Sequence, residues 1–161
     1  MNSAAPTTAF IALGTNLGQR AANLQRAVEL LGRSEGIEVV QVSTALENPA
    51  VGGPQDSPAF LNAVAHVRTT LAPHALLRRL LEIERQMGRV RLRKWEPRLI
   101  DLDLVLYGDA VIETHDLTLP HPRLHERRFV LQPLAEIAPE VVHPVLKRTV
   151  RELLQDLSAA G

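Results

Sequence analysis

Two carboxylates alternate with apolar residues near the middle of the chain. Asp101 and Asp103 lie two residues apart in the segment 98–106, and the alternation of side chains along a strand puts both on one face, about 6.7 Å apart. The opposite, apolar face then comprises Ile100, Leu102, Leu104 and Leu106. Oxygen ligands in a chain without cysteine favour Mg²⁺ or Mn²⁺, and such a pair suits two ions that hold a polyphosphate. The structural alternative is two solvated Asp side chains on a half-exposed strand.

Basic residues lead directly into the carboxylate pair. Residues 78–98 hold eight basic and three acidic side chains, whereas the whole chain has 18 of each and no net charge. Phosphoryl transfer depends on positioning and on neutralising charge, so arginines beside metal-binding carboxylates are groups that this chemistry requires. A solvated helix face accounts for Arg78 and Arg79 but not for the five bases around Trp95. The pattern therefore favours a phosphate-binding site.

A second segment carries groups that suit a flat heterocycle. In residues 60–67 one face is apolar, and Phe60 and Asn62 point the other way, onto the sheet face that also carries the carboxylates. An aromatic plane offers stacking, and an amide two residues away offers both a donor and an acceptor. A core position for Phe60 and a solvated position for Asn62 are the alternatives.

Two further motifs have plainer interpretations. His121 and His125 have a spacing that zinc ligands can have, but Pro120 and Pro122 argue against a helix and no third ligand is evident, so we favour a His and an Arg that contact the same anion. The segment 14–18, GTNLG, follows a strand and opens a helix without matching either common phosphate-binding motif. It therefore predicts a tight turn with helix capping.

The composition indicates one globular domain without cross-links. The chain has 161 residues, of which 45% are apolar and 22% charged, which suits a single core and excludes disorder. It has no cysteine, no apolar run near the ~18 residues of a membrane span, and no signal-peptide pattern at its start. Zero net charge argues against nucleic-acid or membrane-surface partners. We expect a cytoplasmic protein with a flexible tail over residues 1–8 and one domain over residues 9–158.

The hydrophobic pattern predicts an α+β fold in the order β-α-β-β-α-β, a ferredoxin-like sandwich followed by a C-terminal extension and helix. The expected strands are 10–13, 37–46, 60–67 and 99–107. The expected helices run from about Leu24 to Gly32, from Pro73 to Gly88 and from Thr149 to Leu157. In this fold the first two helices cover one sheet face, and we expect the other face to stay open. The long connections 47–58 and 89–98 are expected to be binding loops.

These segments together resemble the 6-hydroxymethyl-7,8-dihydropterin pyrophosphokinases of folate biosynthesis, over about residues 9–157. The resemblance rests on ALGTNLG, NPAVGGPQDSPAFLNAV, IERQMGRVR, PRLIDLDLVLYG and LPHPRLHERRFVLQPLAEIAPE, in this order. It implies a ferredoxin-like fold and transfer of pyrophosphate from ATP to the 6-hydroxymethyl group, with release of AMP. It also implies that the two long connections act as lids, which would keep water from the activated β-phosphorus.

The same resemblance assigns roles to individual residues. Asp101 and Asp103 match the ligands of two Mg²⁺ ions, and Arg89 and Arg98 match catalytic, phosphate-binding arginines. Further positions that match contacts to ATP are Glu84, Arg91, Trp95, Leu117, Thr118, His121 and Arg127. The positions that match the pterin site, where two aromatic rings sandwich the bicycle, are Asn48, Val51, Phe60, Asn62 and Phe129.

Three residues depart from the family's pattern. Glu96 stands where Gly is common and bears on the conformation of its loop, whereas Leu81 and Pro122 replace polar or aromatic residues near ATP. Three rival functions remain: a single-stranded RNA-binding module, a regulatory nucleotide-binding domain, and another Mg²⁺-dependent phosphotransferase or nucleotidyltransferase. An acidic sheet face disfavours the first, and the meeting of carboxylates with arginines disfavours the second. We expect a monomer whose partners are ATP and the pterin.

Overall fold

An antiparallel sheet forms the centre of the fold. The computed structural model describes residues 5–48, 59–88 and 99–160, and within them the sheet has five strands in the order β2-β4-β1-β5, with β3 paired to β4. The strands are β1 (Thr7–Thr15), β2 (Ile37–Val42), β3 (Leu46–Asn48), β4 (Phe60–Thr69) and β5 (Asp101–Tyr107). Because β1 lies between β4 and β5, it brings the segment of Asn62 close to the segment of Asp101.

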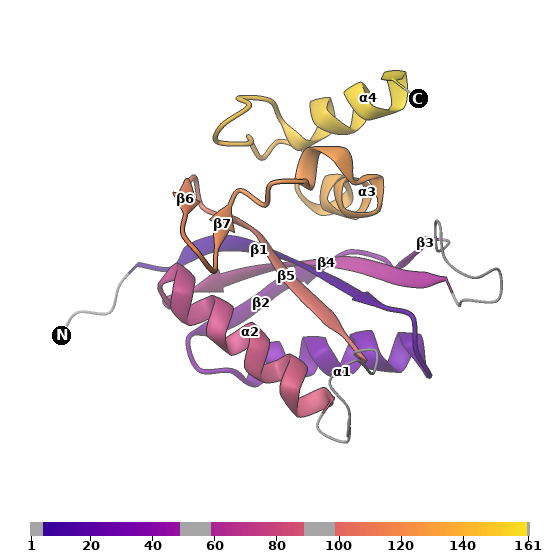
Figure 1. The fold of residues 1–161 in the computed structure, drawn as a ribbon, viewed down its shortest axis with the longest axis vertical. Helices are drawn as coiled ribbons and strands as arrows, with labels where there is room; N and C mark the ends of the chain where they lie inside the picture. The colour runs from indigo at the N-terminus through magenta and orange to yellow at the C-terminus, as the bar shows by residue number, and fades with distance from the viewer. Residues whose placement is uncertain (1–4, 49–58, 89–98, 161) are drawn as a thin grey trace.

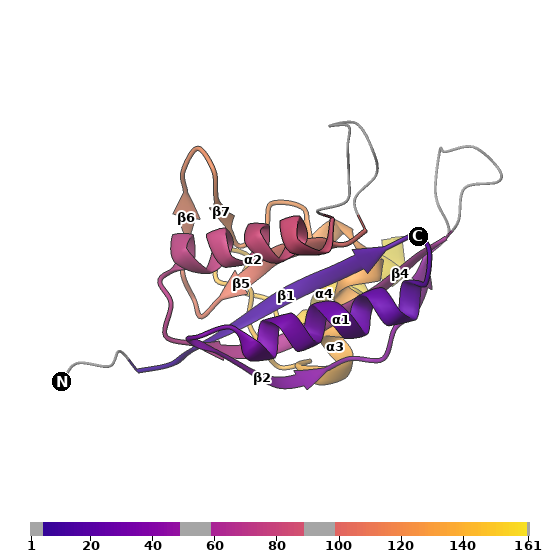
Figure 2. The ribbon, with the colours of Figure 1, turned by 90° about the horizontal axis from the view of Figure 1, so that it is seen from below.

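Two helices lie side by side against one face of this sheet (Figure 2). Helices α1 (Arg20–Arg33) and α2 (Pro73–Met87) each bury one stripe of apolar residues, spaced three or four apart: Leu24, Ala27 and Leu31 in α1, and Leu76, Leu80 and Ile83 in α2. Both stripes join apolar side chains of the strands in one core. The predicted α+β, ferredoxin-like class is confirmed.

The C-terminal segment covers part of the opposite sheet face (Figure 1). There the 3-10 helix η1 (Leu124–Glu126) leads into α3 (Arg128–Ile137), which packs on β4, and α4 (Val150–Ala160) packs on α3 and η1. Their apolar side chains form a second core with four residues of the sheet: Phe10, Val64, Val105 and Leu106. The expectation that this face stays open is therefore wrong for the covered part.

A bulge in β5 reverses one prediction about the side chains of that strand. The β1–β5 register pairs Phe10 with Leu106 but Ile11 with Leu104, so Val105 is one residue in excess. An extra residue of this kind places two neighbouring side chains on one face, and both Val105 and Leu106 belong to the second core. The prediction that Leu106 shares the core face of Leu104 is therefore wrong, because strict alternation stops at Val105.

Several element boundaries differ from the sequence prediction. β1 begins at Thr7, so Thr7 and Thr8 lie in a strand rather than in the expected tail, and α1 continues through Gly32. The expected strand over 37–46 is two strands, and α3 and the hairpin of β6 (Ile112–Glu113) and β7 (Thr118–Leu119) have no counterpart among the predicted elements. α2 begins at Pro73 and ends before Gly88, as predicted.

Most of the two long connections lies outside the described residues. Residues 49–58 and 89–98, which were predicted to belong to binding loops, are not among the described residues. The residues that flank them are described: Asn48 and Ala59 for the first connection, and Gly88 and Leu99 for the second. In the ranges that the structure describes, no helix has the length and apolar character that crossing a bilayer requires.

Candidate active site

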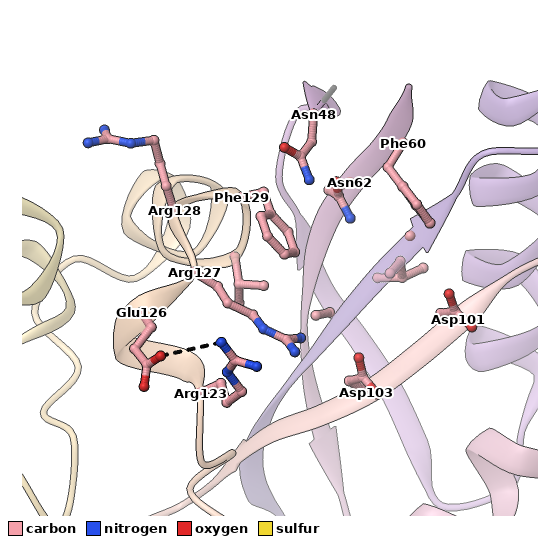
Figure 3. Close-up of a pocket in the computed structure, with 14 residues that line it drawn as sticks. Asn48, Phe60, Asn62, Asp101, Asp103, Arg123, Glu126, Arg127, Arg128 and Phe129 are labelled. Atoms are coloured by element: carbon pink, nitrogen blue, oxygen red, sulfur yellow. Dashed lines mark ion pairs between the residues drawn. The ribbon is translucent and has the colours of Figure 1, made fainter. Parts of the chain in front are cut away.

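A cavity of about 610 Å³ lies on the part of this second sheet face that the C-terminal segment leaves uncovered (Figure 3). Its floor comes from β1, β4 and β5, and one wall comes from η1 and the start of α3. The described residues that line it are Ala12, Leu13, Gly14, Asn48, Phe60, Asn62, Asp101, Asp103, Arg123, Glu126, Arg127, Arg128, Phe129 and Val130. The cavity thus brings together all six of the described residues that were predicted to bind the pterin and the metal ions.

A row of three residues crosses the floor of this cavity. Gly14 pairs with Asn62 on one side and with Asp101 on the other. A Cβ atom on Gly14 would lie 2.7 Å from Asn62 Nδ2, so the glycine leaves the space that the amide occupies. Asn62 is 8% exposed, and its Oδ1 atom has no hydrogen-bond partner among the described residues. A buried amide oxygen without a partner is suited to accept a hydrogen bond from a bound ligand.

The two carboxylates occupy successive rows of the same floor. Asp101 pairs across from Gly14 and Asp103 from Ala12, and both side chains line the cavity. Among the described residues, no group of three or more His, Cys, Asp or Glu side chains is arranged to hold a metal ion. Two carboxylates nevertheless fit Mg²⁺, because this ion is usually bound by one or two carboxylates together with substrate phosphates.

A second cavity, of about 280 Å³, adjoins the first at Asp103. Asp103 lines both cavities, and the other described residues of the second are Leu77, Leu102, Leu104, His115, Asp116, Leu117, Thr118, His121 and Pro122. Three residues predicted to contact ATP, namely Leu117, Thr118 and His121, therefore lie together. One carboxylate separates this group from the pterin group.

His121 is held by backbone contacts beside Asp103. Its N–H donates to the carbonyl of the bulged Val105 (3.0 Å), and its Nδ1 atom accepts from the Arg123 N–H (3.2 Å). Burial lowers the pKa of His121, the Asp103 carboxylate opposes this shift, and the cations of Arg127 and Arg123 add to it. A neutral ring whose Nδ1 accepts a hydrogen bond carries its proton on Nε2. His121 lines the second cavity, and its neutral ring has an Nε2–H donor, whereas the ring of His125 contacts that of His143.

The wall formed by η1 and α3 supplies cations and an aromatic ring. Arg123 and Arg127 extend toward the strand of Asp103, whereas Arg128 points away and donates to Ser158 (Figure 3). The Arg127 guanidinium lies 5.8 Å from the centroid of the Phe129 ring. A residue predicted to contact ATP thus lies beside a residue predicted to contact the pterin. Arg123 forms an ion pair of 3.5 Å with Glu126.

Not every predicted residue lies in these cavities. In the part of the chain that the structure describes, Glu84 is outside both linings, and its Oε2 atom accepts from the Leu102 N–H (2.7 Å), between the two carboxylates of β5. Five predicted site residues lie outside the described residues: Val51, Arg89, Arg91, Trp95 and Arg98. The same holds for Glu96.

Seven residues that line the larger cavity were not predicted: Ala12, Leu13, Gly14, Arg123, Glu126, Arg128 and Val130. Gly14 belongs to the GTNLG segment, which was interpreted as a turn. The turn is present, because Gly18 has a φ of 58° and Asn23 Nδ2 donates to the Leu17 carbonyl (2.8 Å). The predicted helix capping is wrong, because the N-cap residue of α1 is Gln19 and its side chain forms no capping hydrogen bond. Gly14 lines the cavity because its strand pairs it with both Asn62 and Asp101. A single sequence does not show this pairing, so it offered no signal for Gly14.

Comparison with known proteins identifies the family. The profile of the 7,8-dihydro-6-hydroxymethylpterin-pyrophosphokinase (HPPK) family matches residues 10–139, and the chain belongs to this family. It is 44% identical over 153 residues to the 2-amino-4-hydroxy-6-hydroxymethyldihydropteridine pyrophosphokinase of Synechocystis sp., covering 95% of this chain and 77% of that protein. It is 46% identical over 155 residues to the protein of the same name from Methylorubrum extorquens, covering 96% of each.

Solved structures show the same fold in a longer chain. A crystal structure of Plasmodium falciparum HPPK-DHPS superposes with a TM-score of 0.75 at 15% identity. The match covers 96% of this chain and 46% of that chain, so the present chain spans less than half of it. At this identity the likeness concerns the fold alone.

Proposed function

We propose that the protein transfers a pyrophosphoryl group from ATP to the 6-hydroxymethyl oxygen of 6-hydroxymethyl-7,8-dihydropterin and releases AMP, a step of folate biosynthesis. Membership of the pyrophosphokinase family supports this. The observation that carries the proposal is that Asp103 lines both cavities. A carboxylate at this junction suits a reaction that joins two substrates through a phosphate chain.

The larger cavity suits the pterin. Phe60 and Phe129 enter it from β4 and from α3, and the Asn62 amide lies between them (Figure 3). Two aromatic side chains offer stacking to a flat bicycle, and the amide can read its donor and acceptor edge. Asn48, which pairs with Phe60 across β3 and β4, adds a polar group at the rim. Main-chain contacts at Asn48 and Val51 remain part of the proposal.

The smaller cavity suits the nucleotide, with Leu117 and Thr118 at its wall. The phosphate chain would then cross Asp103 toward Asp101. His121 offers its Nε2 proton to a phosphate oxygen, and Arg127 offers its charge from the wall of the larger cavity. As the family resemblance implies, we assign Arg89, Arg91 and Arg98 to the same phosphates, and Glu84 and Trp95 to contacts with ATP.

In the reaction the hydroxymethyl oxygen forms a bond to the β-phosphorus while the bond from that phosphorus to the oxygen of AMP breaks. The hydroxyl proton is released to the solvent as H⁺, and AMP departs with the bridging oxygen. Asp101 and Asp103 would hold two Mg²⁺ ions, which when bound neutralise the phosphates and favour in-line displacement. Phe60, Asn62 and Phe129 hold the hydroxymethyl group toward the β-phosphorus, and a pterin bound between the two rings displaces water from them.

Product analysis tests this function. Purified protein is mixed with ATP, with and without the pterin and with and without Mg²⁺, and the nucleotides are separated and quantified. We expect AMP only when both the pterin and Mg²⁺ are present. ADP in place of AMP would indicate another phosphotransferase. RNA retention without nucleotide turnover would indicate the binding-module alternative.

The remaining features of the proposal concern the protein in the cell. We propose a cytoplasmic monomer, with one domain over residues 9–158, whose partners are the two small substrates. A net charge of zero supports the exclusion of nucleic acid. Sedimentation of the purified chain at micromolar concentration tests the monomer, and a dimer would contradict it.

A further inference from the structure

Arg20 contacts two segments that are distant from it in sequence. It is the first residue of α1, and Gln19 separates it from the GTNLG segment. Its Nη1 atom donates to the Ala59 carbonyl (2.7 Å), and its Nη2 atom forms an ion pair with Glu47 Oε1 (2.8 Å). One guanidinium thus joins the start of a helix to residues on both sides of the segment 49–58. Figure 2 shows the start of α1 beside the start of β4.

Both partners of Arg20 adjoin residues of the larger cavity. Glu47 precedes Asn48 in β3, and Ala59 precedes Phe60 in β4. Asn48 and Phe60 are cross-strand partners, and both line the cavity. Arg20 itself does not line this cavity, so we do not expect it to contact a bound ligand.

The strand that Arg20 restrains has few other contacts of its own. β3 is three residues long and pairs with β4 at the very end of the sheet. Short strands at a sheet end fray easily. A charged donor bound to a carbonyl is stronger than a neutral one, whereas the ion pair to Glu47, whose side chain is 62% exposed, adds little by itself. The contacts of Arg20 therefore bear on local register more than on overall stability.

We infer that Arg20 is a positioning residue for the pterin slot. It fixes the end of β3 against the start of β4, and so fixes the distance between the Asn48 side chain and the Phe60 ring. The inference rests on the proposed function and deepens it. The nucleotide side of the site lies beyond Asp103 on β5 and the β6–β7 hairpin, so it does not depend on this contact.

Calorimetry on three variants tests the inference. Arg20→Ala removes both contacts, and Arg20→Lys keeps the charge but not the two guanidinium nitrogens that make them. Arg79→Ala removes a partly exposed arginine that pairs with Glu82 at 2.7 Å on α2. We expect Arg20→Ala to weaken pterin binding about three- to tenfold, Arg20→Lys less, and Arg79→Ala not at all. Affinity for a Mg²⁺-bound, non-hydrolysable ATP analogue and kcat at saturating pterin should stay within about twofold in Arg20→Ala.

Hydrogen exchange on the ligand-free protein separates this role from the proposed function. In Arg20→Ala we expect faster amide exchange at residues 46–48 and 60–62, and unchanged exchange in the β1–β5 pairs. Unchanged exchange there, or equal losses of pterin and ATP affinity, would overturn the inference. If the wild-type chain makes no AMP from ATP and the pterin, the proposed function fails, and the exchange measurement still decides whether Arg20 positions β3.

Discussion

The amide nitrogen of Asn62 lies 2.7 Å from the place that a Cβ atom on Gly14 would occupy. Two atoms cannot approach so closely without a shift, so Gly14→Ala should displace the Asn62 amide. We expect pterin affinity to fall about 5- to 100-fold, the range for a lost buried hydrogen bond, while affinity for the ATP analogue is retained. Calorimetry with each ligand measures both.

Gly32 offers a matched control for this substitution. A Cβ atom there would meet Val39 Cγ2 at 3.9 Å, an ordinary contact inside α1. Gly32→Ala should leave pterin binding unchanged and raise helix stability by up to roughly 1 kcal/mol. If Gly14 acts through Asn62, then Gly14→Ala should cost little further pterin affinity in an Asn62→Ala background. Additive losses would contradict that route.

The carboxylate pair should matter to turnover much more than to folding. Asp101→Ala and Asp103→Ala each remove a proposed Mg²⁺ ligand, so AMP formation should fall at least ~100-fold. Both residues line the cavity rather than belong to either hydrophobic core, and removing one of two like charges relieves repulsion. The melting temperature should therefore stay within a few degrees of wild type. Retention of more than a tenth of the turnover in both variants would remove the two-metal assignment.

Asn62→Ala should separate binding from stability. Loss of the amide should weaken pterin binding by roughly 1–3 kcal/mol and leave the ATP analogue unaffected. The Oδ1 atom of Asn62 is buried and has no partner within the described residues, so its removal should leave the melting temperature of the ligand-free protein unchanged or higher. A variant that loses ATP affinity but keeps pterin affinity would show that the two cavities are assigned in reverse.

His143 should make folding stability depend on pH. The buried ring accepts hydrogen bonds at Nδ1 from the Val145 and Leu146 N–H groups (3.2 and 3.0 Å). Burial, with a contribution from His125, lowers the pKa of His143 below its ordinary value of 6.5. The unfolded chain therefore binds a proton first, so the stabilising effect is complete above pH 6.5 and is lost as the pH falls toward the lowered pKa.

Urea unfolding at pH 7.5 and pH 5.5 measures this dependence. His143→Asn keeps an acceptor near the Nδ1 position but does not titrate, so its stability should fall less between the two pH values than that of wild type. The lowered pKa values of His66 and His121 act in the same direction, so some dependence should remain. An equal loss in both proteins would exclude His143 as a source.

Local sequence signals were sufficient to predict the ends of α2 and the side chains that β4 turns toward the site. Pro73 and Gly88 mark both ends of α2, and the alternation in β4 puts Phe60 and Asn62 on the site face, as the structure has them. The helix α3 was missed because Pro133 lies inside it, and proline normally ends a helix. The packing of α3 on β4 stabilises this helix in spite of the proline.

Long-range pairing explains what sequence reasoning missed in the site. Gly14 carries no chemical group, and its role follows from the register that places it between Asn62 and Asp101. Arg123 and Glu126 line the cavity because η1 turns the chain back toward β5, and no periodic pattern predicts such a turn. His121 was predicted from its motif, but its anchor on the Val105 carbonyl depends on the bulge.

The extra residue in β5 has a consequence for how this gene can change. Substitution of Val105 by another apolar residue keeps the chain length, so Leu106 stays in the C-terminal core and the Val105 carbonyl still meets the His121 N–H. Loss of the codon would restore strict alternation, turn the next side chain toward the helices α1 and α2, and remove the acceptor that holds His121. At this point of the strand, we therefore expect apolar substitutions to be tolerated and a deletion of one residue not to be.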